Sequence, residues 1–323
     1  MKKLTMGVIG CADFAYRAMI PGILESNSIE LIAIASRSEQ KALQFSKNFN
    51  CEGIVGYGNL LNRKDIDAVY MPLPTGLHEE WVLKALDANK HILIEKSFAM
   101  TYPSAYKMVK SAREKNLLIM ENFLFPHHSQ HAWVKNLIEQ KSLGKIRLLR
   151  STFGFPPFAK SNFRYNSSLG GGALLDIGTY TVKVSKIFLG NDIKILGATI
   201  KYDQNFGVDI YGDAMLKNSR GQIAQVSYGF NYHYQCHYEL LGTQGKLTVE
   251  RAFTPPPGFE PKVILESQNN CREIFLPSDN HYINMANFFA DTIQKENDFG
   301  LHLDELLEQS RLLEEIHSMA SGK

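Results

Sequence analysis

Residues 4–15 read LTMGVIGCADFA, an apolar run that turns sharply at Gly10. A helical pattern follows through Leu24, and a second apolar run covers residues 29–35. Strand, glycine turn, helix and strand within about thirty residues are the layout of a dinucleotide-binding βαβ unit. We therefore expect an α/β protein that contains a parallel sheet.

The turn itself has the chemistry that a pyrophosphate needs. Gly10 permits the tight bend, and a helix that begins near Asp13 directs its free N–H groups and the positive end of its dipole at the turn. Ala15 is small enough for close packing, whereas Ala12 replaces the second glycine of the G-x-G-x-x-G/A pattern and crowds the pyrophosphate or moves it outward. On this motif alone, an ordinary strand-to-helix turn stays open. The cofactor contacts assigned to this turn are Gly10, Ala12, Asp13, Phe14 and Ala15.

The end of the second strand indicates which dinucleotide is bound. An NAD site usually has a carboxylate there to hold the ribose hydroxyls, but this chain has Ser36, Arg37 and Ser38, with Lys41 close behind. A guanidinium suits a 2′-phosphate, and the hydroxyls add hydrogen bonds. We predict NADP(H) as the cofactor, held by these four residues. The alternative is that Arg37 is a solvated loop residue.

Length and composition exclude several classes of protein. A chain of 323 residues, 44% of them hydrophobic, can build two packed domains. A net charge of +2 gives no basis for binding nucleic acid or an anionic membrane, and no apolar run is long enough to cross a bilayer. The four cysteines lack metal-type or disulfide spacing, and no signal-peptide pattern is present. We expect a cytoplasmic protein that acts on a small molecule, with no nucleic-acid or membrane partner.

Strands and helices alternate up to about residue 122, which is typical of a doubly wound parallel sheet of the Rossmann type. Ligands of such sheets bind outside the carboxyl ends of the strands. A buried strand, residues 91–94, ends in Glu95 and Lys96. The residues that we expect along this cleft edge are Gly10, Arg37, Thr75, Glu95, Lys96, Glu121 and Asn122. The cofactor contacts assigned to this edge are Pro72, Leu73, Thr75, Glu95, Lys96 and Asn122.

From about residue 123 the pattern changes to longer strands with one strong helix, residues 173–189. Long strands without interleaved helices favour an α+β domain with a largely antiparallel open sheet. We predict an NADP-binding Rossmann domain at residues 1–122 and a substrate-binding and oligomerisation domain at residues 123–323, with closing helices near its end. An uncovered sheet face predicts a homodimer or a homotetramer.

Three side chains are candidates for the chemistry. Lys96 ends a buried strand at the cleft edge, where it can hydrogen-bond a substrate hydroxyl; a lysine that reaches solvent is the alternative. Asp176 and Tyr180 lie four residues apart on one helix and share a face. A tyrosine near a cation becomes a better proton donor or acceptor. Taken alone, these two residues favour the structural interpretation, in which Tyr180 is a core aromatic and Asp176 an ordinary first-turn acid.

Together the motifs resemble the Gfo/Idh/MocA oxidoreductases. The matching stretches are GVIGCA at 7–12, PTGLH at 74–78, HILIEK at 91–96, and GGGALLDIG at 170–178 with Tyr180. Ser97 stands where the family's Glu-Lys-Pro motif has proline. Tyr180 stands where the inositol dehydrogenases often have histidine, which resembles the branch of glucose–fructose oxidoreductase, dihydrodiol dehydrogenase, xylose dehydrogenase and nucleotide-sugar 3-ketoreductases. The stretches 71–74, 121–131 and 251–256 look most like the last of these.

This resemblance implies reduction by NADPH of the C3 keto group of a dTDP-linked keto-deoxysugar. In it, Lys96 orients the sugar and steadies the charge, Tyr180 protonates the developing alkoxide, and Asp176 positions a sugar hydroxyl or the nicotinamide. Thr75 and His78 help to hold the cofactor. The weaker candidates for the nucleotide diphosphate are Arg164, Tyr165, Tyr232 and His233.

Other functions stay open on the sequence. One is an NADP-dependent aldose (xylose or glucose) or trans-dihydrodiol dehydrogenase, which runs the same chemistry in reverse. Another is an NADP-binding sensor without catalysis, against which the presence of both Lys96 and Tyr180 argues. His127 and His131 have the i, i+4 spacing that suits zinc, but no third ligand is evident, and we predict no metal.

Overall fold

The computed structural model describes residues 2–295 and 298–322. The described chain forms two compact units. The first comprises Met1–Leu124 and His281–Leu307, and the second comprises Phe125–Asn280 and Glu308–Lys323. The boundary drawn from the sequence differs in two respects: it ends the first domain at residue 122 and not at residue 124, and it assigns residues 281–307 to the second domain.

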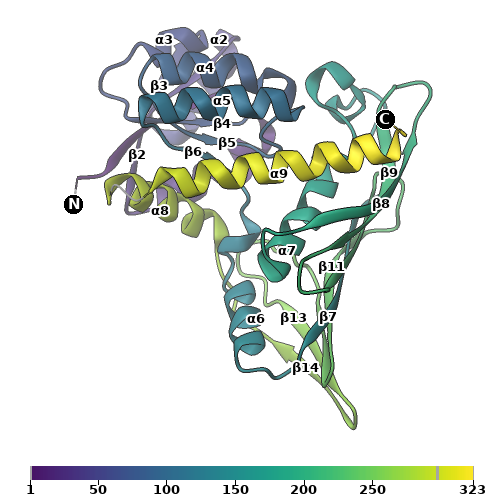
Figure 1. Ribbon diagram of the computed structural model, residues 1–323. Helices are drawn as coiled ribbons and strands as arrows, with labels where there is room; N and C mark the ends of the chain where they lie inside the picture. The colour runs from purple at the N-terminus through teal and green to yellow at the C-terminus, as the bar shows by residue number, and fades with distance from the viewer. Residues whose placement is uncertain (1, 296–297, 323) are drawn as a thin grey trace. The chain divides into compact units, whose positions relative to one another are not determined.

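The first unit is built on a six-stranded parallel sheet (Figure 1). Its strand order is β3-β2-β1-β4-β5-β6, the order of a Rossmann fold. The strands are β1 (Leu4–Ile9), β2 (Ile29–Ser36), β3 (Glu52–Val55), β4 (Ala68–Met71), β5 (His91–Ile94) and β6 (Ile119–Glu121). The pairing of Ile9 with Ala35 and of Met71 with Ile94 aligns the carboxyl ends of these strands. The predicted doubly wound sheet is confirmed.

Helices cover both faces of this sheet. They are η1 (Ala15–Met19, a π-helix), α1 (Ile20–Glu25), α2 (Glu39–Phe49), α3 (Tyr57–Leu61), η2 (Thr75–Leu77), α4 (His78–Asp87), α5 (Tyr102–Lys115) and α8 (His281–Gln294). Successive side chains of β4 enter different cores: Ala68 and Tyr70 belong to one, Val69 and Met71 to the other. This is what a strand buried on both faces requires.

Helix α8 and the start of α9 (Phe299–Ala320) explain why residues 281–307 belong to the first unit. Leu303 and Leu306 of α9 are buried in the core that contains Val69. Met285 and Phe289 are buried in the same core as Met19 and Ile20. At Gly22 of α1 a Cβ atom would lie 2.5 Å from Cβ of Tyr282, so glycine allows the two helices to touch. The apolar spacing within α8 reveals a buried face, but only this packing reveals the sheet that it covers.

The second unit contains an eight-stranded mixed sheet of order β14-β13-β12-β11-β7-β10-β9-β8. Only the β7–β10 pair is parallel, and the other pairs are antiparallel. The strands are β7 (Ile146–Gly154), β8 (Lys194–Tyr202), β9 (Asp209–Lys217), β10 (Ile223–Gly229), β11 (Gln235–Gly242), β12 (Gly245–Val249), β13 (Lys262–Ser267) and β14 (Asn270–Phe275). The predicted largely antiparallel sheet is confirmed, and the hairpin β13–β14 extends it beyond the strands expected from the sequence.

Helices of the second unit are η3 (Phe125–His127), α6 (Ser129–Glu139), η4 (Phe163–Tyr165), η5 (Ser167–Leu169), η6 (Leu174–Gly178) and α7 (Thr179–Leu189), with the end of α9 (Phe299–Ala320). Helix α7 packs on one face of the sheet, against β7 and β10. The single helix expected at 173–189 begins as a π-helix, η6. A Cβ atom at Gly178 would lie 3.0 Å from the ring of Tyr228, so glycine lets this helix approach the sheet. Among the described residues, no helix is long and apolar enough to span a membrane.

Candidate active site

The glycine turn of the first unit has the predicted geometry. Gly10 has φ +117°, a conformation that favours glycine, and its N–H donates to the Ala35 carbonyl at 2.9 Å. A Cβ atom there would lie 2.9 Å from Cδ2 of Leu73. Ala15 is completely buried, as its proposed packing role requires. The helix that follows starts as the π-helix η1, and π-turns are frequent at functional sites.

Two other predicted residues of the turn lie on its outer side. Asp13 forms an exposed ion pair with Arg17 at 2.5 Å. The ring of Phe14, which is also exposed, lies 6.2 Å from the ring of Tyr282. Ala12 is half-buried and packs against the core of the first unit.

The residues after β2 form a compact polar loop. The Ser36 hydroxyl accepts a hydrogen bond from the Ser38 N–H at 3.1 Å, and the Ser38 hydroxyl accepts from the Lys41 N–H at 3.4 Å as the N-cap of α2. Burial raises the pKa of Tyr57, while the nearby charge and hydrogen bond of Arg37 partly oppose that rise. Arg37 is exposed at the carboxyl edge of the sheet, where a guanidinium can meet a phosphate.

The loop after β4 is fastened by a buried histidine. Both ring nitrogens of His78 face backbone carbonyls, Nε2 that of Leu73 at 2.8 Å and Nδ1 that of Phe98 at 3.0 Å. Burial lowers the pKa of His78. Pro72 and Leu73 are buried and Thr75 is half-exposed in η2. His78 therefore joins this loop to the one that follows Lys96.

A buried polar network lies at the ends of β5 and β6. Glu95 Oε1 accepts hydrogen bonds from the Tyr70 hydroxyl at 2.6 Å and from Asn122 Nδ2 at 2.7 Å. Burial raises the pKa of Glu95, against the effects of these two donors and the charge of Lys96. Asn122 Oδ1 is buried and has no hydrogen-bond partner in the described part of the chain.

Lys96 leads into a firmly held segment. The peptide bond between Lys96 and Ser97 is cis. One residue further on, the Phe98 N–H donates to Glu121 Oε1 at 2.8 Å. Lys96 is half-buried, and Ser97 and Glu121 are buried. The main chain next to Lys96 is therefore held by both a buried carboxylate and His78.

In the second unit, Tyr180 lies within a group of phenylalanines. Its ring is 5.2 Å from that of Phe153, 5.9 Å from that of Phe125 and 5.7 Å from that of Phe253. Its side chain is half-buried on the first turn of α7. Contacts with three rings restrict the rotation of the Tyr180 side chain. The position of its hydroxyl therefore follows the position of the backbone of α7.

Asp176 is paired with Arg164. Arg164 Nε lies 2.5 Å from Asp176 Oδ2, with side chains 24% and 10% exposed. The guanidinium also stacks 4.7 Å from the ring of Phe158 and 4.8 Å from that of Phe163. Asp176 therefore carries its charge beside a fixed cation, one helical turn before Tyr180.

The structure separates the other predicted substrate residues. Tyr165 packs 4.9 Å from Phe206, and its hydroxyl accepts from the Phe158 N–H at 3.2 Å, so it supports the loop that carries Arg164. His233 is exposed in the loop after β10.

Tyr232 lies on the opposite face of the sheet from α7. It pairs with Ser227 at 3.2 Å, whereas the neighbouring Tyr228 faces α7, where it meets Gly178. Tyr232 is consequently not brought to Tyr180, because the alternation of side chains along β10 turns Ser227 away from the helix.

His131, one of the two histidines whose spacing suggested zinc, has other contacts. His131 Nδ1 lies 3.0 Å from the Tyr238 hydroxyl, and its Nε2 lies 2.9 Å from the Ala252 carbonyl, both deep in the core. Among the described residues, no group of three or more His, Cys, Asp or Glu side chains could hold a metal ion.

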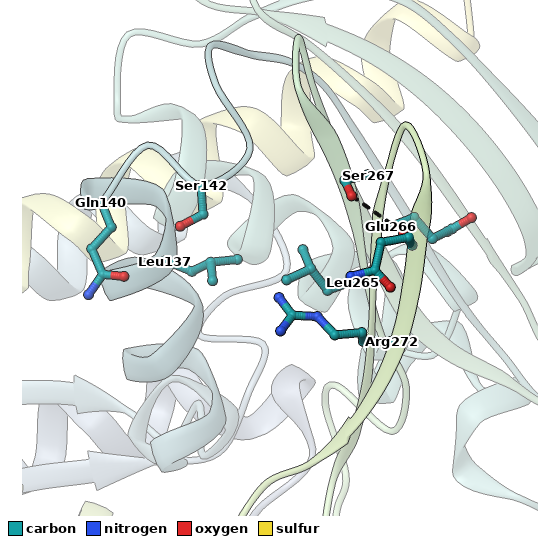
Figure 2. Close-up of a pocket in the computed structure, with 8 residues that line it drawn as sticks. Leu137, Gln140, Ser142, Leu265, Glu266, Ser267 and Arg272 are labelled. Carbon is teal, nitrogen blue, oxygen red and sulfur yellow. Dashed lines mark hydrogen bonds between the residues drawn. The ribbon is translucent and has the colours of Figure 1, made fainter.

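A cavity of about 320 Å³ lies elsewhere in the second unit, between the end of α6 and the hairpin β13–β14. Figure 2 shows Arg272 and Leu265 on the hairpin side and Leu137 with Gln140 on the helix side. None of the predicted site residues lines it, so we do not assign it to the active site.

Two groups of site residues carry no motif in the sequence. Tyr70 lies inside an apolar strand, and Phe153 and Phe253 are single aromatics of the second unit. Each acts through a residue at least 25 positions away, Tyr70 on Glu95 and the phenylalanines on Tyr180. A tyrosine within a strand buried on both faces is the one available signal, because a buried hydroxyl needs a partner.

Comparison of the sequence with known protein families identifies the family of this chain. Residues 4–123 match the Gfo/Idh/MocA model described as the oxidoreductase family with an NAD-binding Rossmann fold. Residues 131–248 match the Gfo/Idh/MocA C-terminal domain. The chain belongs to the Gfo/Idh/MocA family of oxidoreductases.

Particular relatives are similar over nearly the whole chain. The dTDP-3,4-didehydro-2,6-dideoxy-α-D-glucose 3-reductase of Saccharopolyspora spinosa is 42% identical over 293 residues, 91% of this chain and 88% of that protein. The crystal structure of KijD10, a 3-ketoreductase from Actinomadura kijaniata in complex with NADP and TDP-benzene, matches with a TM-score of 0.95 at 36% identity, over 98% of both chains. The D-xylose 1-dehydrogenase (NADP(+)) 2 of Haloferax volcanii is 27% identical, over 98% of this chain and 97% of that protein.

Proposed function

We propose that this protein is an NADPH-dependent 3-ketoreductase that acts on a dTDP-linked keto-deoxysugar. The observation that carries the proposal is the likeness of the whole chain to a 3-ketoreductase that holds NADP and TDP-benzene, with a TM-score of 0.95 at 36% identity. The 42% identity to a dTDP-sugar 3-reductase supports the same substrate class. The xylose dehydrogenase is more distant at 27% identity, so the aldose or dihydrodiol dehydrogenase is the less supported alternative.

The first unit offers suitable contacts for NADP(H). The Gly10 turn and the start of η1 suit the pyrophosphate, because N–H groups at a helix start attract anions. Arg37, with Ser36 and Ser38 around it, suits the 2′-phosphate. The unpartnered Oδ1 of Asn122 suits a hydrogen-bond donor of the nicotinamide half. When bound, NADPH supplies a hydride.

The proposed reaction is a balanced reduction of a ketone. The hydride forms a C–H bond at C3, the C=O bond becomes a C–O single bond, and the Tyr180 hydroxyl gives its proton to that oxygen. The products are the C3 alcohol and NADP⁺, and solvent returns a proton to Tyr180. Lys96 would orient the sugar and stabilise negative charge on the oxygen.

In each unit, residues next to the proposed catalytic side chains have supporting roles. Asp176, held by Arg164 at 2.5 Å, is a hydrogen-bond acceptor for a sugar hydroxyl. In this proposal the main role of Arg164 is to pair with Asp176, and contact with a phosphate is secondary. Glu95, held by Tyr70 and Asn122, supports the segment that carries Lys96.

The test is oxidation of NADPH, followed by absorbance, with an enzymatically generated dTDP-3-keto-deoxysugar. We expect rapid turnover with NADPH and little with NADH. Tyr180→Phe and Lys96→Ala should each lose about 100-fold or more in kcat, as expected for general acid–base groups. Tyr202→Phe, an exposed tyrosine at the end of β8 in the same unit, is the matched control and should retain wild-type turnover.

Two outcomes would redirect the proposal. No oxidation of NADPH, together with reduction of NADP⁺ by a free aldose or a trans-dihydrodiol, would move the enzyme to the dehydrogenase alternative. Full turnover in the double variant of Lys96 and Tyr180 would remove the assigned site.

We also propose a homodimer or homotetramer in the cytoplasm. The face of the second sheet opposite α7 presents exposed apolar side chains, among them Tyr211, Met215 and Leu241, and such faces commonly pair. Light scattering of the wild type and of Met215→Glu tests this: a monomeric wild type contradicts the proposal, and a monomeric variant supports it.

A further inference from the structure

A buried carboxylate outside the predicted site holds the start of the helix that carries Asp176 and Tyr180. Asp209, the first residue of β9, is only 7% exposed. Its Oδ2 accepts the Leu174 N–H at 2.6 Å. This is one of the N–H groups that a helix start leaves without an intrahelical partner. Asp209 thus supplies, from 35 residues away, the cap that the local sequence lacks.

The carboxylate occupies the space of an absent side chain. Gly172 has φ +124°, and a Cβ atom there would lie 2.1 Å from Asp209 Oδ1. Any other residue at position 172 would therefore collide with the carboxylate and adopt a strained backbone. The Asp209 carboxylate therefore requires glycine at position 172, the third glycine of the GGG stretch.

The same helix is also held at its middle. Gln309 Nε2 donates to the Thr179 carbonyl at 2.9 Å and lies 3.1 Å from its hydroxyl. Gly178 rests on the ring of Tyr228. Between the contact of Asp209 at Leu174 and that of Gln309 at Thr179 lies the whole π-helix η6, which includes Asp176.

We infer that Asp209 is a positioning residue for Tyr180, acting through the start of η6. The phenylalanines around Tyr180 come from η3, β7 and the loop after β12, none of which Asp209 holds. A shift of η6 therefore moves Asp176 and the Tyr180 hydroxyl relative to these phenylalanines, which stay in place. The effect on turnover rests on the proposed function; the anchoring of the helix does not.

Asp209→Asn is the test, because it keeps the shape but removes the negative charge and replaces one of the two acceptor oxygens with an NH₂ group. We expect kcat to fall about 100-fold, as for a misplacement of about 1 Å, with a much smaller change in the KM for the sugar and unchanged binding of NADPH. Amides of residues 174–180 should exchange hydrogen faster. Gly172→Ala displaces the same carboxylate and should give the same pattern, which covers the case in which one variant does not fold.

The matched control is Asp279→Asn. Asp279 Oδ2 accepts the Ser129 N–H at 2.7 Å at the start of α6, so it is also a carboxylate that caps a helix from far along the chain. This variant should leave kcat and the exchange of residues 174–180 unchanged.

The outcomes separate this inference from the proposed function. If Asp209→Asn keeps wild-type kcat, or if its residues 174–180 exchange as in the wild type, Asp209 is not a positioning residue. Equal loss in Asp279→Asn also overturns the inference, because the effect would then be general to the unit. If the wild type oxidises no NADPH, only the proposed function is contradicted. Hydrogen exchange in Asp209→Asn still decides whether Asp209 anchors η6.

Discussion

Replacing Tyr70 with phenylalanine removes one of the two hydrogen bonds to Glu95 Oε1 without changing the packing of the ring. Tyr70 is completely buried, and its hydroxyl lies 2.6 Å from the carboxylate. Burial and the charge of Glu95 raise the pKa of Tyr70, so the hydroxyl stays a donor. A hydrogen bond to a charged group contributes about 1.5–3 kcal/mol, and one between neutral groups contributes about 1 kcal/mol.

The loss should therefore depend on pH. Burial raises the pKa of Glu95 above its ordinary value of 4.5, so Glu95 is ionised above that raised pKa and neutral below it. We expect Tyr70→Phe to lower the free energy of unfolding of the first unit by about 2 kcal/mol when Glu95 is ionised, and by about 1 kcal/mol after Glu95 binds a proton. The destabilisation grows as pH rises through the pKa of Glu95.

Urea unfolding followed by tryptophan fluorescence measures this difference. The chain has two tryptophans, and in a Trp133→Phe background only Trp81, in α4 of the first unit, reports. Tyr106→Phe, 54% exposed on α5, is the control and should stay within about 0.5 kcal/mol. A destabilisation that is below about 0.5 kcal/mol, or that grows as pH falls, would refute the assignment of this hydrogen bond to an ionised Glu95.

Three further predictions follow from single contacts. Arg164→Met removes the guanidinium that pairs with Asp176 Oδ2 and should lower the free energy of unfolding by about 2 kcal/mol and reduce kcat, with Arg164→Lys intermediate; a neutral effect by thermal unfolding would contradict the pairing. Arg37→Glu should raise the KM for NADPH about 10- to 100-fold, from lost charge-assisted hydrogen bonds, and leave that for NADH nearly unchanged; equal effects on both would make Arg37 a solvated loop residue. Burial raises the pKa of Asp209 to about 6 from 3.8, so the ionised carboxylate opposes folding. As the pH falls from about 7 to about 5, the free energy of unfolding of the wild type should rise by about 1 kcal/mol relative to that of Asp209→Asn. A relative fall over the same range, measured in paired unfolding curves, would show that folding stabilises the ionised carboxylate.

The candidate site was only partly within reach of the sequence. Gly10 and Ala15 serve a local turn, so their spacing predicts their roles, and Lys96 ends a strand that its apolar run reveals. Tyr232 was expected near the substrate but lies behind the sheet, because a tyrosine in a loop gives no sign of which face it will cover. Arg164 was expected at a phosphate and is found on Asp176, since an ion pair across 12 residues has no pattern in the sequence.

The sequence alone determined the βαβ unit, the alternation of strands and helices, the change to a largely antiparallel sheet and the membership of the family. Those features depend on periodicity and turn chemistry among residues close in the chain, and on motifs that can be read directly. Only the tertiary structure decided that α8 returns to the first sheet, that Tyr70 holds Glu95, and that Asp209 fills the space at Gly172. Each of these is a contact between residues at least 25 positions apart, fixed by packing and by the need of buried polar groups for partners, which no local pattern records.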